Sequence, residues 1–457
     1  MKRKRFLRLV ALLAALLLAC TAAVADGVEA PPGGKAPEAA GEGMPPELPG
    51  EGVEPPKDMK PAQAPGGQPG GTISQGTSAT TLEVDATISG GSFTSQKADE
   101  NALRVTHEAQ VMLTGVTIEK AEGDTSSAEN SDFYGQNAGF LATDGAEAAI
   151  SAVSVTTAAT GSNAVVSYGA GTAVSVTDST VRTTGDHSGG IHVVGGGGLT
   201  AWDVDVETQG KSSAAIRSDR GGGILTANGG RYVTNGTGSP SIYSTAQIAV
   251  SNAQLTANNS EAIVVEGYNS VTLTDCTVSG NMQGTYGPGS GENLHGVMLY
   301  QSMSGDAEAG ESHFQMTGGS LTTLAGDLFY VTNTDCAIEL SGVALIPADG
   351  CLLRVEGNSG ERGWGTPGKN GGHCTLNASA QALTGTIWVD EISSLEMRLS
   401  DGATFEGAVN PEGQAGEVHV TLEDGCHWKL TADTYVTSFT GDLSCVETNG
   451  YTLYTAQ

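Results

Sequence analysis

The side chains best suited to bind a ligand lie in stretches that interrupt an otherwise regular sequence. Four of these candidates are aromatic and one is cationic, and they are Phe133, Tyr134, Tyr286, Trp364 and Arg362. Aromatic faces flanked by polar groups suit stacking against sugar rings. The alternative is that each aromatic residue only anchors a long loop onto the rest of the protein.

A second candidate group is charged. Arg217, Asp219 and Arg220 stand directly before the run Gly221–Gly223, in a chain with only 16% charged residues. Two cations around one acid could bind a polar ligand, or they could form a local ion pair at a turn. A phosphate-binding loop is excluded because the glycines lack the strand–loop–helix context that such loops need.

The elements that must position these residues follow from a repeat. Pairs of apolar residues stand about 13–16 residues apart, and a new pair begins about 21–26 residues later. The pairs are Val165 with Val181, Ile191 with Val206, Ile216 with Tyr232, Ile242 with Leu255, Ile263 with Val278, and Phe329 with Leu345. Such a period, rich in Gly and β-branched residues, indicates a solenoid.

The repeat predicts an all-β fold, a single-stranded right-handed parallel β-helix with loop insertions. Its handedness follows from the general rule for parallel crossovers. An antiparallel β-sandwich array is the competing fold, but turns of the Asn-Gly type occur only sporadically. Residues 122–136 and 279–295 should leave one corner of the helix, and residues 302–312 and 357–372 another. Insertions in solenoids collect on the binding face.

Three sequence runs resemble those of a known family. They are Asp99–Val105, Ala214–Gly223 and Gly296–Ser304, and they look like runs in secreted, adhesin-like right-handed β-helix proteins of anaerobic gut bacteria, within the pectate-lyase-like β-solenoid superfamily. The resemblance covers about residues 75–457. It implies the fold and a role in surface binding, and it brings no catalytic residues with it.

Catalysis has little support in the residues. Asn333-Thr334-Asp335 matches one short signature of β-helical polygalacturonases, but their Asp-Asp, Gly-His-Gly and Arg-Ile-Lys motifs do not follow it. Metalloprotease and serine hydrolase motifs are also missing from the sequence. We therefore assign no catalytic residue, metal ligand or cofactor. Calcium could act in such a fold, but no motif supports it.

Six cysteines follow residue 20, all in the C-terminal half. Cys336 and Cys374 occupy equivalent places in successive coils. At a strand spacing of about 4.8 Å their α-carbons would lie within bridging range. We expect a contact between them, either a disulfide or a stacked pair of free thiols. Zinc is not expected because no Cys-x-x-Cys motif is present.

The N-terminal part of the chain predicts export. Residues 1–19 have a basic start and an apolar run, as in a signal peptide. Leu17-Leu18-Ala19-Cys20 resembles a lipoprotein cleavage site, with Cys20 lipidated. The alternative site, Ala23-Val24-Ala25, would release a soluble secreted protein. Residues 20–72 are rich in Pro and Gly, which predicts a disordered linker before a β-helix domain at 73–457.

Charge narrows the partners. The chain carries a formal net charge of −30, which repels both nucleic acid and anionic membrane surfaces. Only a lipid anchor should therefore bring the protein to a membrane. We expect a non-catalytic, adhesin-like protein at the cell surface that recognises an extracellular glycan or a surface protein. The alternatives are a polysaccharide lyase or glycoside hydrolase on the same scaffold, and a structural surface-coat protein. The sequence does not indicate the oligomeric state.

Overall fold

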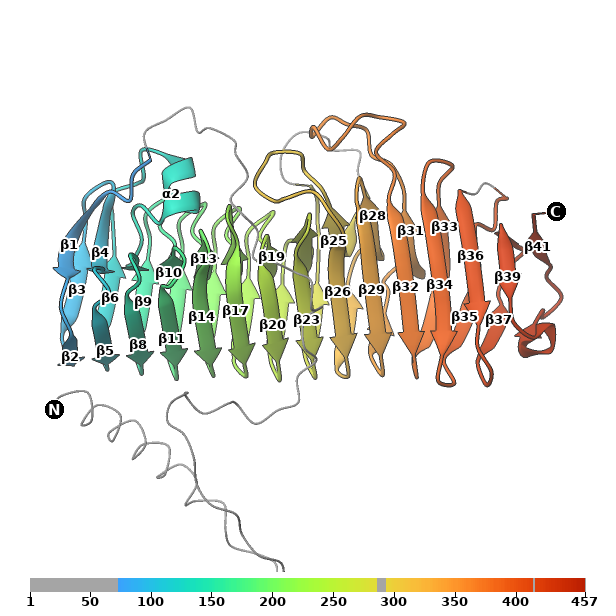
Figure 1. Cartoon of the computed structure of the whole chain (residues 1–457), viewed down its shortest axis with the longest axis horizontal. Coiled ribbons are helices and arrows are strands. Elements are labelled where there is room, and N and C mark those ends of the chain that lie inside the picture. Colours follow the sequence, from blue (N-terminus) through green and yellow to red (C-terminus); the bar gives the residue numbers. More distant parts are fainter. Residues whose placement is uncertain (1–72, 286–292, 414–415, 457) are drawn as a thin grey trace, which may run out of the picture. The chain divides into compact units, whose positions relative to one another are not determined.

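A computed structural model of the chain describes residues 73–285, 293–413 and 416–456. Within these ranges the strands form three long parallel sheets around one core (Figure 1). Each pass of the chain up to residue 346 adds one strand to every sheet, and the later passes extend only two of the three long sheets. This arrangement is the predicted parallel β-helix. The predicted signal peptide, Cys20, the linker and Tyr286 lie outside the described residues.

Sheet A contains β1 (Thr77–Leu82), β4 (Glu100–Val105), β7 (Phe140–Ala142), β10 (Val165–Tyr168), β13 (Ile191–Val194), β16 (Ile216–Ser218), β19 (Ile242–Ser244), β22 (Ile263–Glu266), β25 (His295–Tyr300), β28 (Asp327–Thr332), β31 (Cys351–Val355), β33 (Ala382–Val389), β35 (Thr404–Val409), β37 (His427–Leu430) and β40 (Val446–Glu447). Sheet B contains β2 (Ala86–Ser89), β5 (Gln110–Thr114), β8 (Glu147–Ser151), β11 (Ala173–Thr177), β14 (Gly197–Trp202), β17 (Gly223–Asn228), β20 (Gln247–Ser251), β23 (Ser270–Thr274), β26 (Ser312–Thr317), β29 (Asp335–Ser341), β32 (His373–Ser379), β34 (Ser394–Ser400), β36 (Glu417–Leu422) and β39 (Ser438–Thr440). Sheet C contains β3 (Ser92–Ser95), β6 (Thr117–Lys120), β9 (Ser154–Thr157), β12 (Thr180–Thr183), β15 (Asp205–Thr208), β18 (Arg231–Thr234), β21 (Gln254–Ala257), β24 (Thr277–Gly280), β27 (Ser320–Thr323) and β30 (Ala344–Ile346). A small fourth sheet pairs β38 (Thr434–Val436) with β41 (Leu453–Thr455), and the described part of the chain also contains the helix α2 (Ala128–Tyr134) and the short 3₁₀ helix η2 (Leu443–Cys445).

The predicted apolar pairs form the core. The first residue of each pair lies in sheet A and the second in sheet C, and both kinds stack on their equivalents in the next rung. Val165 pairs in register with Ile191, and Val181 with Val206, and all four side chains are buried. Every strand pairing among the described residues is parallel, which excludes the antiparallel sandwich.

Polar ladders close the corner between sheets C and A. The backbone N–H of Ser188 donates to the hydroxyl of Ser213 one rung on, and Ser213 donates in the same way to Ser239, both at 2.9 Å. Beside them, the hydroxyl of Thr183 donates to the carbonyl of Ser188 at 2.6 Å. Each of these buried groups thus has a hydrogen-bond partner. The hydrogen bonds fix the conformation of the corner from which the chain enters sheet A.

Glycines allow this corner to stack so closely. A Cβ added at Gly210 would lie 1.9 Å from the carbonyl oxygen of Gly185, whereas one added at Gly284 would meet nothing within 4 Å. We expect Gly210→Ala to lower the free energy of unfolding by about 1–3 kcal/mol, because backbone must move. Gly284→Ala should change it by less than about 0.5 kcal/mol. Urea unfolding of both variants measures the difference, and equal effects would contradict the packing.

Cys336 lies opposite Cys374 in the register of β29 and β32, and both are buried free thiols. Burial, together with the hydrogen bond that the Cys336 thiol donates to Cys374, raises the pKa of Cys336 well above its usual value. The pair therefore packs as small apolar side chains on adjacent rungs.

Candidate functional site

The insertions surround the outer face of sheet A. Residues 121–139, which include α2, lie between β6 of sheet C and β7 of sheet A, and the second insertion begins after β24 of sheet C and ends at β25 of sheet A, so both start from the corner between sheets C and A. The loops after β25 and after β31 leave the opposite corner, between sheets A and B. The predicted grouping of the insertions by corner is confirmed, and the two corners flank one sheet (Figure 1).

A row of side chains runs along this outer face. Each member directly follows a buried apolar residue of its strand, so it points away from the core. In register, the row reads His192, Arg217, Tyr243, Val264, Met298 and Tyr330. Along this row the side chains change from His and Arg to Tyr and then to apolar residues within a few rungs. Neighbouring rungs are roughly 4.8 Å apart.

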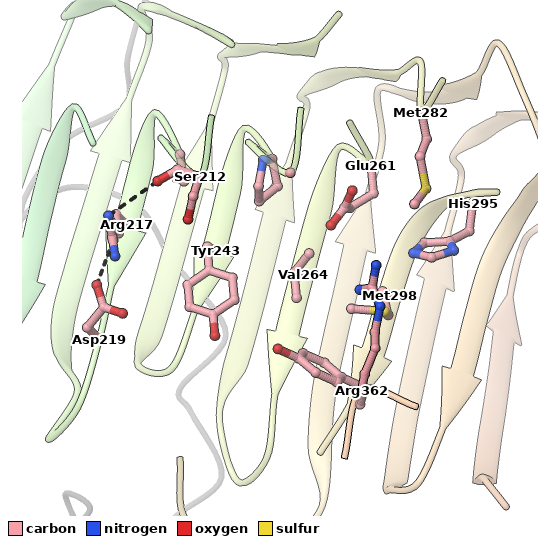
Figure 2. Close-up of a pocket in the computed structure, with 14 residues that line it drawn as sticks. Ser212, Arg217, Asp219, Tyr243, Glu261, Val264, Met282, His295, Met298 and Arg362 are labelled. Carbon is pink, nitrogen blue, oxygen red and sulfur yellow. Dashed lines mark hydrogen bonds and ion pairs between the residues drawn. The ribbon is translucent and has the colours of Figure 1, made fainter. Parts of the chain in front are cut away.

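The middle of this row forms the floor of a pocket with a volume of about 200 Å³. Arg217 and Asp219 lie at one end, and His295 and Met282 lie at the other (Figure 2). The remaining lining residues are Ser212, Ala214, Gly238, Pro240, Tyr243, Glu261, Val264, Met298, Tyr300 and Arg362. Apolar surface with a few convergent polar groups is typical of small-ligand sites, although this pocket is smaller than most.

Arg217 is the centre of a buried ion network. Its guanidinium contacts Asp219 at 2.6 Å and Asp132 of α2 at 2.9 Å. Asp219 also lies 3.0 Å from Nε2 of His192 on the preceding rung. The predicted local pair of Arg217 with Asp219 is therefore present, and it belongs to a larger cluster that also fixes α2 to the sheet.

The two carboxylates of this network differ in pKa. Burial raises the pKa of Asp132 despite the nearby Arg217. Burial acts in the same direction on Asp219, but Arg217 and His192 outweigh it and bring its pKa below the usual value. Such opposed shifts beside a pocket are characteristic of functional sites, and of structural ion networks as well.

A second polar cluster orients the tyrosines. Glu266 accepts hydrogen bonds from the hydroxyls of Tyr243 at 2.5 Å, of Tyr300 at 3.0 Å and of Ser302. Burial raises the pKa of Glu266 and of both tyrosines. Because both phenols are held by one carboxyl group, their rings have fixed positions in the pocket wall.

Arg220 joins two insertions. Its guanidinium lies 4.0 Å from the centre of the Phe133 ring in α2, and it contacts Asp306 in the loop after β25 at 2.7 Å. Arg220 is thus not part of the Arg217 pair, although the two residues are close in sequence. It holds the loops of opposite corners together beside the pocket.

Trp364 and Arg362 come from the loop after β31. Trp364 is buried against Tyr300, with ring centres 4.7 Å apart, and the Arg362 guanidinium lies 4.8 Å above the Trp364 ring. Trp364 therefore anchors its loop, while Arg362 reaches the pocket. Tyr134 packs edge-on against Tyr168, 6.0 Å away, and does not line the pocket.

Sequence reasoning did not identify Asp132, His192, Tyr243 or Glu266 as site residues. The signal that could have found two of them is their position after a predicted core residue, which places His192 and Tyr243 in the outer row. Strand alternation also places Glu266 on the outer face, two residues after Val264, whereas Asp132 gave no such signal because an insertion positions it.

Across residues 73–285, 293–413 and 416–456, no group of three or more His, Cys, Asp or Glu side chains could hold a metal ion. The same part of the chain contains no helix of the length and apolar character that crossing a membrane requires. No protein-family model, curated protein or solved structure matches this chain.

Proposed function

We propose that this protein is a non-catalytic binding protein of the cell surface and that the pocket on sheet A takes part of a glycan. One observation carries the proposal: insertions from two corners meet over a single sheet face, around a pocket that combines oriented aromatic rings with charged groups. Tyr243 and Tyr300 offer ring surface, and Arg217, Glu261 and His295 offer polar atoms. Sugars present both kinds of surface to a protein.

A protein partner is less well supported by this site. Stable protein interfaces bury about 800 Å² on each side. A pocket of about 200 Å³ takes one small group of a ligand. The resemblance to adhesin-like β-helix proteins supports surface binding in general and is compatible with a glycan.

Glycan arrays with the full chain, followed by calorimetry, test the proposal. Tyr243→Ala should weaken binding by about tenfold or more, because it removes a central ring. Tyr451→Ala, at an exposed tyrosine outside the pocket, is the matched control and should leave affinity unchanged. Absence of any saturable glycan would favour a structural surface coat instead.

Glycoside hydrolysis is the second candidate, because Asp132 and Asp219 have opposed pKa shifts, as an acid and a base would. Asp219 lines the pocket, but Asp132 does not. A general acid must reach the bond that it cleaves, so this geometry favours binding. Release of reducing-end or unsaturated products from pectin, alginate or mucin would overturn the non-catalytic proposal.

The surface location is part of the proposal and rests on residues 1–72 alone. Lipidation at Cys20 and a Pro- and Gly-rich spacer would hold the β-helix away from the membrane. Detergent partitioning and surface labelling of intact cells test it, and recovery of all the protein from the medium would favour the soluble secreted form.

A further inference from the structure

His295 presents an unused hydrogen-bond acceptor at the pocket. It is the first residue of β25, its side chain is buried, and it lines the end of the pocket opposite Arg217 (Figure 2). Its Nε2 atom has no hydrogen-bond partner among the residues that the structure describes. A buried polar atom of this kind needs a functional or structural explanation.

The tautomer of His295 follows from its other nitrogen. Nδ1 lies 3.1 Å from the backbone carbonyl oxygen of Asn293. A carbonyl oxygen only accepts, so Nδ1 carries the proton and donates it. Burial also lowers the pKa of His295, which favours the neutral ring. Nε2 therefore holds a lone pair and can only accept a hydrogen bond from a donor.

Neighbouring rungs hold this arrangement in place. The side-chain amide of Asn293 donates to Asp327 at 2.6 Å, and Arg354 donates to the same carboxylate oxygen at 2.5 Å. Asp327 is also the register partner of His295 in β28. The Asn293 side chain is thus held by the next two rungs, which limits the movement of the residue whose carbonyl accepts from His295.

The charges at the pocket disfavour an anion. Arg217 is already paired with two carboxylates, and Arg362 lies over Trp364. Glu261 and Asp219 line the pocket, in a protein whose net charge is −30. A carboxylated sugar would meet these acids as well as the guanidinium groups, so it gains no net attraction from the lining.

We propose that the pocket binds an uncharged, hydroxyl-rich sugar ring, and that a sugar hydroxyl donates a hydrogen bond to Nε2 of His295. This inference rests on the proposed glycan-binding function and names the class of sugar. An amino sugar gains no net attraction either, because its ammonium group would meet the guanidinium groups of Arg217 and Arg362 as well as the acids.

Matched sugar series test the inference with the full chain. The probes are oligosaccharides of neutral hexoses, of the corresponding hexuronates and of the corresponding hexosamines, titrated by calorimetry. The neutral series should bind most tightly. Tighter binding of the uronates or of the hexosamines would overturn the inference while leaving glycan binding intact. Failure of all three series, and of the array, would instead overturn the proposed function.

Variants of His295 test the hydrogen bond. His295→Phe keeps a ring but removes the acceptor, and it should weaken binding of the neutral series about tenfold. His295→Gln retains an acceptor and should stay within about threefold of the wild type. His313→Phe, at a partly exposed histidine of β26, is the matched control and should have no effect. Unchanged affinity in a folded His295→Phe protein would overturn the inference.

The pH profile separates this hydrogen bond from simple packing. Glu261, Asp327 and Arg362 are the charged groups that act on His295. Protonation of Nε2 removes the acceptor, so wild-type affinity should be constant near pH 7 and fall only below the usual histidine range. His295→Gln should lose this fall. If a variant fails to fold, the ¹⁵N resonance of Nε2 in the wild type must still shift when neutral sugar is added, and no shift would refute the contact.

Discussion

Arg217→Ala should lower the free energy of unfolding by about 3–5 kcal/mol, because it leaves the buried carboxylate of Asp219 and the largely buried one of Asp132 without their cation. Asp132 and Asp219 both contact the Arg217 guanidinium, whose side chain is only 7% exposed. Asp132 belongs to α2, so the same change should release this helix from the sheet. Urea unfolding measures the loss, and hydrogen exchange of the α2 amides reports the release.

The pH dependence of this variant has a definite sign. Without Arg217, the folded state takes up a proton on a carboxylate more readily than the unfolded chain does. The stability deficit should therefore shrink as the pH falls from 7 towards 5. Arg398→Ala is the control, since its ion pair with Glu423 is mostly exposed and should contribute less than about 1 kcal/mol. Equal losses in both variants would contradict a buried network.

Trp428→Ala should also cost about 3–5 kcal/mol, for a different reason. Trp428 is 1% exposed, and its ring centre lies 5.5 Å from that of Phe405 and 6.3 Å from that of Phe439. Its indole N–H donates to the Gly407 carbonyl at 3.1 Å. The substitution would open a cavity near the last rungs and remove this hydrogen bond.

A second variant of Trp428 separates the effect of packing from that of the hydrogen bond, and a variant at an exposed tryptophan is the control. Trp428→Phe keeps an aromatic ring and should lose only part of the stability, while Trp202→Ala, at an exposed residue of β14, should change it by less than about 0.5 kcal/mol. Because a solenoid is stabilised rung by rung, the loss in Trp428→Ala should appear first in the C-terminal rungs by hydrogen exchange. Uniform loss of protection along the chain would contradict this expectation.

Much of the scaffold was predictable from local pattern. The pairs that begin at Val165, Ile191 and Ile216 identified the strands of sheets A and C, since each rung must place an apolar residue at the same point of a narrow core. The residue after each of these lies outside, so the outer row was also implicit in the sequence. The register between neighbouring strands thus follows from the sequence repeat wherever each rung contributes its apolar residues to the core.

The pocket was less predictable, because it depends on where the insertions fold back. Phe133 and Arg220 were both candidates, but nothing in their sequence positions indicated that they meet, or that Asp306 joins them. Tyr134 was a candidate of equal standing and packs elsewhere. Loop paths depend on long-range contacts, which leave no periodic signal.

The sequence by itself determined the parallel β-helix and the corners from which the insertions leave, because these follow from a repeated apolar spacing that each rung must satisfy. Only the tertiary structure decided that Asp132 of α2 reaches Arg217, that Arg362 reaches the same pocket, and that Nε2 of His295 has no hydrogen-bond partner among the described residues. The physical reason is that stacking constrains each rung through its neighbours, whereas a site made by insertions depends on contacts between residues far apart in the chain.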